Sequence, residues 1–152
     1  MANTGRIVKR LLLCAPRSRV WEALADADQF GRWFQVKLDG PFLEGARIRG
    51  RILHPGYEHV PFHMTIERLE PERLFSWRWH PNSVDPAADY SNEPTTVVVF
   101  ELEELEDGTL LTMEESGFEG IPLTRLMDAY RGNEQGWTEQ FNAIEQYLGI
   151  GD

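Results

Sequence analysis

The longest amphipathic pattern of the chain lies near its C-terminus, between Leu123 and Leu148. Large apolar residues recur there at intervals of three, four or seven positions, the spacing of one face of an α-helix. A lone long helix must bury such a face against other structure, so the pattern predicts a long helix packed on a sheet. The residues on this face are Leu126, Tyr130, Trp137, Phe141, Ile144 and Leu148.

Most of the preceding sequence predicts strands. A first strand is expected at Arg6–Leu13, followed by two short helices, one from Pro16 to Ala25 and one carrying Phe30, Trp33 and Phe34. From Gln35 onward apolar and polar residues alternate, and turn-forming sequences separate the alternating segments. The order is therefore one strand, two short helices, six strands and one long helix. The sequence predicts an α+β fold, because one long helix cannot cover both faces of a parallel sheet.

One segment breaks the alternation. Residues His80–Pro94 contain three prolines and little periodicity, which predicts a long loop between two strands. A long loop in a compact domain is either a lid over a site or a surface excursion. If the loop is a lid, its candidate residues are His80, Asp85 and Tyr90.

Composition narrows the classes of function. The 152 residues fit a single domain spanning 1–152, and a hydrophobic fraction of 41% supports a folded core. Fifteen Lys and Arg against 25 Asp and Glu give a net charge of −10, which disfavours binding to nucleic acid or to an anionic membrane. The sequence shows neither a membrane-spanning apolar segment nor the pattern of a secretory signal, so we expect a cytoplasmic protein.

Familiar catalytic motifs are absent from the sequence. Cys14 is the only cysteine, which excludes an intrachain disulfide, and its apolar neighbours predict a buried thiol. No serine lies in a nucleophile elbow, and no glycine-rich phosphate loop is present. His59 and His63 have a spacing that suits a metal on a helix, but here they enter a strand. We therefore expect neither a metal nor a cofactor.

Glu115 is the most unusual polar residue. It is in phase with Leu111 and Met113, which places it on the face of the last strand that meets the long helix. Three alternatives are open for such a carboxylate. It lies in a pocket with a raised pKa, it pairs with an arginine, or the strand end dips into solvent.

The helix pattern thins between Tyr130 and Trp137. Gly132 and Gly136 flank Asn133 and Glu134 there, which indicates either an irregular helix or the floor of a cavity. Aromatic residues exceed what a minimal core needs, so a minority are candidates for the wall of an apolar pocket. The full set of cavity candidates is Trp33, Phe62, Met64, Trp77, Trp79, Phe100, Met113, Glu115, Leu126, Tyr130, Asn133, Glu134 and Trp137.

Several segments together resemble the START-like superfamily, also called the Bet v 1-like or SRPBCC superfamily. They are similar to its bacterial branch related to the C-terminal domain of the activator of Hsp90 ATPase. The resemblance implies a helix-grip fold, in which a curved antiparallel sheet of six or seven strands wraps around the C-terminal helix, and a cavity for a small apolar or amphipathic ligand. The segments are 16–24 (PRSRVWEAL), 30–34 (FGRWF), 80–90 (HPNSVDPAADY), 93–100 (EPTTVVVF), 115–118 (ESGF) and 133–148 (NEQGWTEQFNAIEQYL).

Three functions are open at this stage. The first is a carrier that binds a small hydrophobic or amphipathic ligand without catalysis. The second is a cyclase-like or hydrolase-like enzyme that uses Glu115 as acid or base, with His54 or His63 nearby. The third is a co-chaperone or stress-response module that modulates a partner ATPase. Because superfamily members are monomers or dimers, the resemblance leaves the oligomeric state open.

Overall fold

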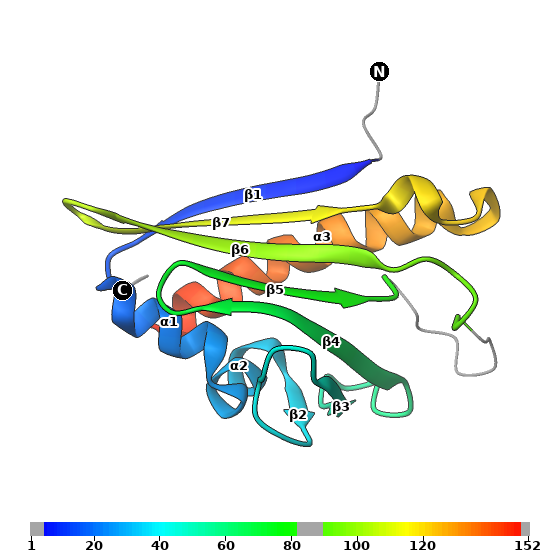
Figure 1. The fold of residues 1–152 in the computed structure, drawn as a ribbon, viewed down its shortest axis with the longest axis horizontal. Coiled ribbons are helices and arrows are strands. Elements are labelled where there is room, and N and C mark those ends of the chain that lie inside the picture. The colour runs from blue at the N-terminus through cyan, green and yellow to red at the C-terminus, as the bar shows by residue number, and fades with distance from the viewer. Residues whose placement is uncertain (1–4, 82–89, 150–152) are drawn as a thin grey trace.

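A seven-stranded antiparallel sheet lies along one long helix (Figure 1). This computed structural model describes residues 5–81 and 90–149. Within them the strands follow the order β1-β7-β6-β5-β4-β3-β2, so that β1 and β2 form the two edges. The strands are β1 (Arg6–Leu13), β2 (Val36–Leu38), β3 (Arg47–Ile52), β4 (Pro61–Glu70), β5 (Leu74–Trp79), β6 (Thr96–Leu105) and β7 (Gly108–Ser116).

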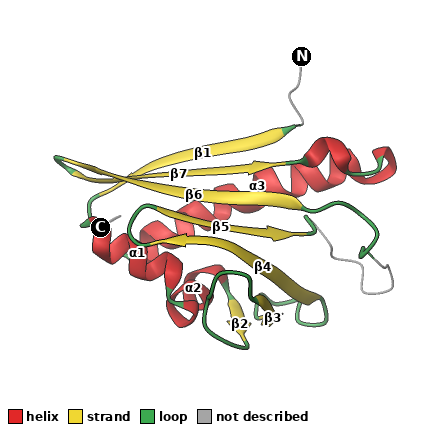
Figure 2. Ribbon diagram, viewed as in Figure 1, coloured by secondary structure: helices red, strands yellow, loops and turns green. Residues whose placement is uncertain are grey.

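Three α-helices cover the sheet, as Figure 2 shows in red. They are α1 (Arg17–Ala25), α2 (Ala27–Phe34) and α3 (Leu123–Tyr147), and a 3-10 turn at Phe118–Gly120 precedes the last of them. Tyr147 Oη lies 3.2 Å from Gln29 Oε1, which joins the C-terminal end of α3 to α2. The α+β class, the helix-grip arrangement and the two short helices after the first strand are confirmed.

Buried and half-buried side chains alternate along β7, so every second residue faces the core. Leu111, Met113 and Glu115 are all fully buried, whereas the residues between them are half-buried. The hairpin between β6 and β7 turns at Gly108, where φ is +147° and an added Cβ would lie 2.1 Å from the Leu13 carbonyl oxygen. Only glycine fits this position, which fixes the register of β6 on β7 and of β7 on β1.

Local sequence also explains the two short helices. Asp26 caps α2 by accepting a hydrogen bond from the backbone N–H of Asp28 at 3.0 Å. Gln35 then adopts a left-handed conformation with φ 61°, which ends α2 and directs the chain into β2. Pro16 lies before α1 with extended backbone, so its predicted place inside the first turn was wrong by one residue. A proline suits either place because its missing N–H is not needed there.

Helix α3 ends within one residue of its predicted limit. Trp137, Phe141 and Ile144 are buried against the sheet, as the spacing of the apolar face predicted. Toward the N-terminal end, Leu126 and Tyr130 are only partly buried. The C-terminal half of α3 therefore anchors the fold.

The prediction for Cys14 was wrong. Its thiol is exposed, although leucines precede it in the sequence. Leu13 is completely buried at the end of β1, and successive residues of an extended chain point to opposite sides. The alternation of side chains along the extended chain therefore exposes Cys14, although its sequence neighbours are apolar.

Candidate functional site

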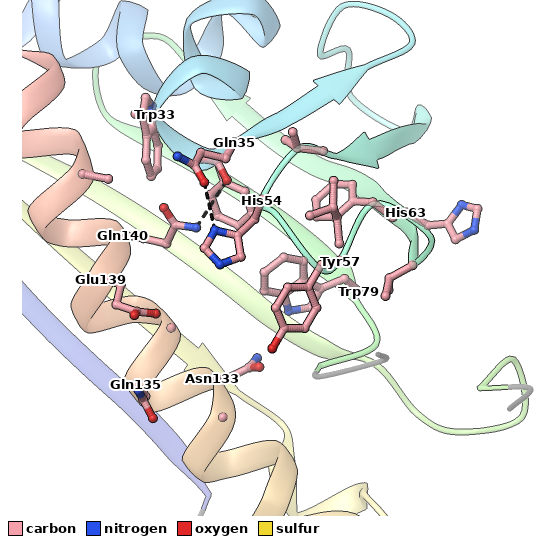
Figure 3. A pocket seen from close by; sticks show the side chains of 18 of the residues that line it. Trp33, Gln35, His54, Tyr57, His63, Trp79, Asn133, Gln135, Glu139 and Gln140 are labelled. Carbon is pink, nitrogen blue, oxygen red and sulfur yellow. Dashed lines mark hydrogen bonds between the residues drawn. The ribbon is translucent and has the colours of Figure 1, made fainter. Parts of the chain in front are cut away.

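A pocket of about 700 Å³ lies between the middle of α3 and the β2–β4 end of the sheet (Figure 3). The end of α2, the loop between β3 and β4, and the end of β5 complete its walls. Its lining residues are Trp33, Phe34, Gln35, Val36, Ile52, His54, Tyr57, Val60, Pro61, Phe62, His63, Trp79, His80, Gly132, Asn133, Gln135, Gly136, Glu139, Gln140 and Ala143.

Three aromatic rings form a continuous apolar wall. The ring centroids of Phe34, Phe62 and Trp79 lie 6.0 to 6.1 Å from one another, with edge-to-face or tilted orientations. Trp33 packs on Phe34 at 5.6 Å and anchors α2 by donating its indole N–H to the Ala23 carbonyl oxygen at 2.7 Å. These rings come from α2, β4 and β5, so the packing of three elements creates the wall.

Polar side chains also line the pocket. His54 Nδ1 lies 3.1 Å from Gln35 Oε1, and the His54 ring packs against Tyr57. Gln140 donates a weak hydrogen bond of 3.4 Å from Nε2 to the Phe34 carbonyl oxygen. Glu139 is the only Asp, Glu, Lys or Arg among the described residues that line the pocket.

Behind the pocket wall, Glu115 is completely buried and its carboxylate accepts hydrogen bonds from four side chains. Its Oε2 accepts from Trp79 Nε1 at 2.8 Å and from Thr96 Oγ1 at 2.6 Å. Its Oε1 accepts from Trp137 Nε1 at 2.8 Å. Asn133 Nδ2 bridges both oxygens, at 2.9 Å from Oε1 and 3.0 Å from Oε2.

Two sequence relationships assemble this cluster. Trp79 and Thr96 are directly opposite each other on β5 and β6, and Glu115 lies on the neighbouring strand β7. Asn133 and Trp137 are four residues apart on α3 and therefore share a helix face. The cluster thus joins three strands to the helix through one carboxylate.

Each of the three places predicted for the Glu115 carboxylate was wrong. The side chain does not reach solvent, and none of the described Lys or Arg side chains forms an ion pair with it. The carboxylate also does not line the pocket. Instead, two of its four partners, Trp79 and Asn133, line the pocket and stand between the pocket and Glu115.

The structure brings some of the predicted cavity residues to the pocket. Trp33, Phe62, Trp79, Asn133 and the predicted lid residue His80 line it. The remaining cavity candidates do not line it and lie in the core, behind the wall or on the helix surface. These are Met64, Trp77, Phe100, Met113, Glu115, Leu126, Tyr130, Glu134 and Trp137.

The Trp137 ring fills the space between α3 and the central strands, 6.2 Å from Trp77 and 5.7 Å from Phe100. It also packs behind the pocket wall, 6.0 Å from Trp79 and 6.1 Å from Phe34. The open space of the pocket lies beside Gly132 and Gly136 of α3. These two glycines occupy one helix face with Gln140, and the sequence had indicated a cavity floor here as one of two alternatives.

The polar rim of the pocket, which includes Gln35 and His54, was not predicted from the sequence. Gln35 and His54 come from segments that the alternation leaves between regular elements, and their approach to α3 depends on tertiary packing. His54 and His63 were expected near the site only in the enzyme hypothesis. The lining residues with functional side chains that the sequence did not indicate are Phe34, Gln35, Tyr57, Gln135, Glu139 and Gln140.

The two described ends of the predicted loop at 80–94 are held against α3. Arg125 donates to the Glu93 carboxylate at 2.8 Å and to the Pro81 carbonyl oxygen at 3.0 Å. Its guanidinium also lies 4.7 Å from the ring of Tyr90. His80 Nε2 is 3.1 Å from the Glu93 carbonyl oxygen. The third predicted lid residue, Asp85, lies outside the described residues.

Burial lowers the pKa of His63, and the positive charges of Arg47 and Arg49 lower it further, followed by His80. The His63 ring points away from the pocket in Figure 3. Among the described residues, no group of three or more His, Cys, Asp or Glu side chains is arranged to hold a metal ion. No helix in that part of the chain is long and apolar enough to cross a membrane.

Comparison with known proteins gives a family and a fold. A family model described as "Activator of Hsp90 ATPase homolog 1-like protein" matches residues 14–149. No curated protein sequence matches significantly. The solved structure of MLL2253 from Mesorhizobium loti is 26% identical, with a TM-score of 0.75, and the match covers 97% of this chain and 98% of that one.

Two further structures share the fold. The Aha1 dimer from Colwellia psychrerythraea, solved in solution, is 20% identical with a TM-score of 0.72, over 97% of this chain and 98% of that one. CalU16 from Micromonospora echinospora is 24% identical with a TM-score of 0.65, over 94% and 75%. At these identities the likeness concerns the fold alone.

Proposed function

This chain belongs to the Activator of Hsp90 ATPase homolog 1-like family of the START-like superfamily, and we propose that it binds a small amphipathic ligand in the pocket beside α3. The observation that carries the proposal is the pairing of an aromatic wall with a polar rim around one space. Small-molecule sites are typically concave spaces of about 300–1,000 Å³ with mostly apolar walls and a few polar groups. This pocket has a volume of about 700 Å³, and both aromatic and polar side chains line it.

The wall composition favours a ligand with a flat apolar part. Phe34, Phe62 and Trp79 present ring faces and edges, which pack well against another ring system. Gln35 and His54, which also line the pocket, provide hydrogen-bonding groups. A molecule with one apolar and one polar end satisfies both surfaces.

An enzyme that uses Glu115 as acid or base gains no support from the geometry. The carboxylate is enclosed by four hydrogen-bond donors, and Trp79 and Asn133 stand between it and the pocket. A general acid or base must come within hydrogen-bond reach of its substrate. We therefore propose binding rather than catalysis at this site.

The proposal is tested by filling the pocket from α3. Gly136 lines the pocket, and a Cβ added there meets no atom within 4 Å, so Gly136→Phe introduces a ring without a clash at its point of attachment. Glu134→Phe, two residues away on an exposed site outside the pocket, is the matched control. Fluorescent polycyclic probes are titrated against the wild type and both variants, and native mass spectrometry measures stoichiometry.

We expect saturable one-to-one binding by the wild type and by Glu134→Phe, and a loss of roughly tenfold or more in affinity for Gly136→Phe. The reason is steric exclusion from the pocket. Absence of binding by the wild type to any probe contradicts the proposal. So does equal binding by wild type and Gly136→Phe, because the probe then binds elsewhere.

A further inference from the structure

We infer that the buried Glu115 cluster fixes the ligand class, so that the pocket selects aromatic molecules carrying a hydroxyl or amino group and rejects those with a carboxylate. The inference rests on the proposed function and adds to it the chemistry of the polar group that the ligand presents. It follows from the orientation of one amide, that of Asn133, and from the charges along the pocket.

The Asn133 amide can face Glu115 in only one way. Its Nδ2 lies 2.9 and 3.0 Å from the two carboxylate oxygens, and a carboxylate accepts hydrogen bonds without donating any. The reverse orientation brings the amide oxygen against the carboxylate, two acceptors face to face in a buried place. Burial of unpaired acceptors is costly, so the cluster holds the NH₂ group inward.

The oxygen of the Asn133 amide, Oδ1, remains available to a group in the pocket. Asn133 lines the pocket, and Figure 3 shows its side chain projecting from α3 toward it. None of the hydrogen bonds among the described residues ends on Asn133 Oδ1. With Nδ2 held by a carboxylate on the far side, Oδ1 is an acceptor directed to the ligand space. A ligand that donates a hydrogen bond satisfies it.

The position of this acceptor sets where the donor sits on the ligand. Trp79 and Asn133 bond to the same Glu115 oxygen, so the acceptor lies at the border of the aromatic wall. Because the Trp79 N–H is used by Glu115, Trp79 offers the pocket only apolar ring surface. A ligand ring packed on this surface carries its donor directly on the ring, as in a phenol or an aromatic amine.

The charges along the pocket oppose an anionic ligand. None of the described lining residues is a Lys or Arg, and the single formal charge there is the carboxylate of Glu139. Burial and the charges of Arg47 and Arg49 lower the pKa of His63, which disfavours a positive charge on its ring. A carboxylate on the ligand therefore loses its water without gaining a cation, which is unfavourable.

A matched set of pyrene probes tests the inference. Pyrene, 1-hydroxypyrene, 1-methoxypyrene and 1-pyrenecarboxylate share one ring system and differ in the polar group. Titration by fluorescence should show 1-hydroxypyrene binding about tenfold more tightly than 1-methoxypyrene, since a net hydrogen bond contributes about a factor of ten. The carboxylate should bind more weakly than pyrene itself.

Asn133→Ala removes the acceptor and leaves Glu115 its three other donors. In this variant we expect the preference for hydroxyl over methoxy to fall to about twofold or less, with pyrene binding retained. Glu115→Gln should reduce the same preference, because an amide at 115 can face either end of Asn133. Glu134→Ala, exposed and outside the pocket, is the control that keeps the preference.

The outcomes separate the inference from the proposed function. Equal affinities for the hydroxyl and methoxy probes, or tightest binding of the carboxylate, overturn the inference while ligand binding itself stands. A preference that survives Asn133→Ala also overturns it, because the acceptor is then another group. If even pyrene fails to bind the folded wild type, both the inference and the proposed function fail.

Discussion

Trp79 and Asn133 donate hydrogen bonds to the same oxygen of Glu115, at 2.8 and 3.0 Å, although one lies on β5 and the other on α3. Both also line the pocket. The wall of the pocket is therefore built on a buried carboxylate that does not itself line the pocket. Changes at Glu115 should act on both the stability of the fold and the shape of the pocket.

The first prediction concerns stability. Glu115→Leu leaves two indole N–H groups, one hydroxyl and one amide without an acceptor, and we expect a loss of about 3–5 kcal/mol in the free energy of unfolding. Glu115→Gln keeps one acceptor oxygen and should cost less, about 1–3 kcal/mol. Urea unfolding followed by tryptophan fluorescence measures both. Glu114→Gln is the control, since its partner Arg6 is 3.7 Å away and exposed, and it should change stability little.

The second prediction concerns the ion pair that holds the ends of the loop at 80–94. Arg125 and Glu93 are about four-fifths buried as side chains, and Arg125 also contacts Pro81 and Tyr90. We expect Arg125→Ala to lower the free energy of unfolding by about 2–3 kcal/mol, because a partly buried carboxylate loses its partner.

A double-mutant cycle with Glu93→Gln isolates the pair. Substituting both residues should cost less than the sum of the single changes, since each single variant already removes the interaction. Additive losses would show that Arg125 acts through its other contacts. Arg131→Ala on the exposed side of α3 is the matched control for removal of an arginine.

The third prediction contrasts two glycines. At Gly136 an added Cβ meets no atom within 4 Å, so Gly136→Ala should raise the free energy of unfolding by about 0.5–1 kcal/mol through helix propensity. At Gly108 the same substitution forces a Cβ onto the Leu13 carbonyl oxygen at a positive φ, and we expect a loss of about 2 kcal/mol or more. Thermal and urea unfolding of both variants check the opposite signs.

The fourth prediction concerns pH. Burial, with Arg47 and Arg49 next, lowers the pKa of His63 in the folded protein below its ordinary value near 6.5. The unfolded chain then binds more protons at this site, so stability is full above pH 6.5 and falls as the pH drops through and below that value. Urea unfolding at pH 7.5 and pH 5.5 should show a smaller difference for His63→Gln than for wild type. An unchanged difference contradicts the prediction, and His59→Gln, whose side chain lies outside the pocket lining, is the control.

The fold could be predicted from the sequence because the regular spacing of apolar residues identifies each strand and helix and the face that it buries. The phase shared by Leu111, Met113 and Glu115 placed the carboxylate on the correct face of β7, and the spacing from Trp137 to Ile144 placed the buried part of α3. Both inferences need only the geometry of one element.

The pocket was harder to predict because it depends on contacts between elements. Trp77 and Trp79 look alike in the sequence, two positions apart on the same strand face, yet one is in the core and the other lines the pocket. Trp77 packs against the core rings of Phe75 and Phe100, whereas Trp79 packs against Phe34 and Phe62 of the pocket wall. The rim residues His54 and Tyr57 lie in a loop, whose position has no periodic signal.

One consequence of the Glu115 cluster concerns ionic strength. A surface pair such as Arg6 and Glu114 is screened by dissolved salt, because ions can gather around both charges. The buried carboxylate is balanced by neutral N–H and O–H dipoles at distances of 2.6 to 3.0 Å, and mobile ions cannot enter between them. The connection between sheet and helix should therefore keep its strength in concentrated salt, where the surface pairs of this acidic protein lose theirs.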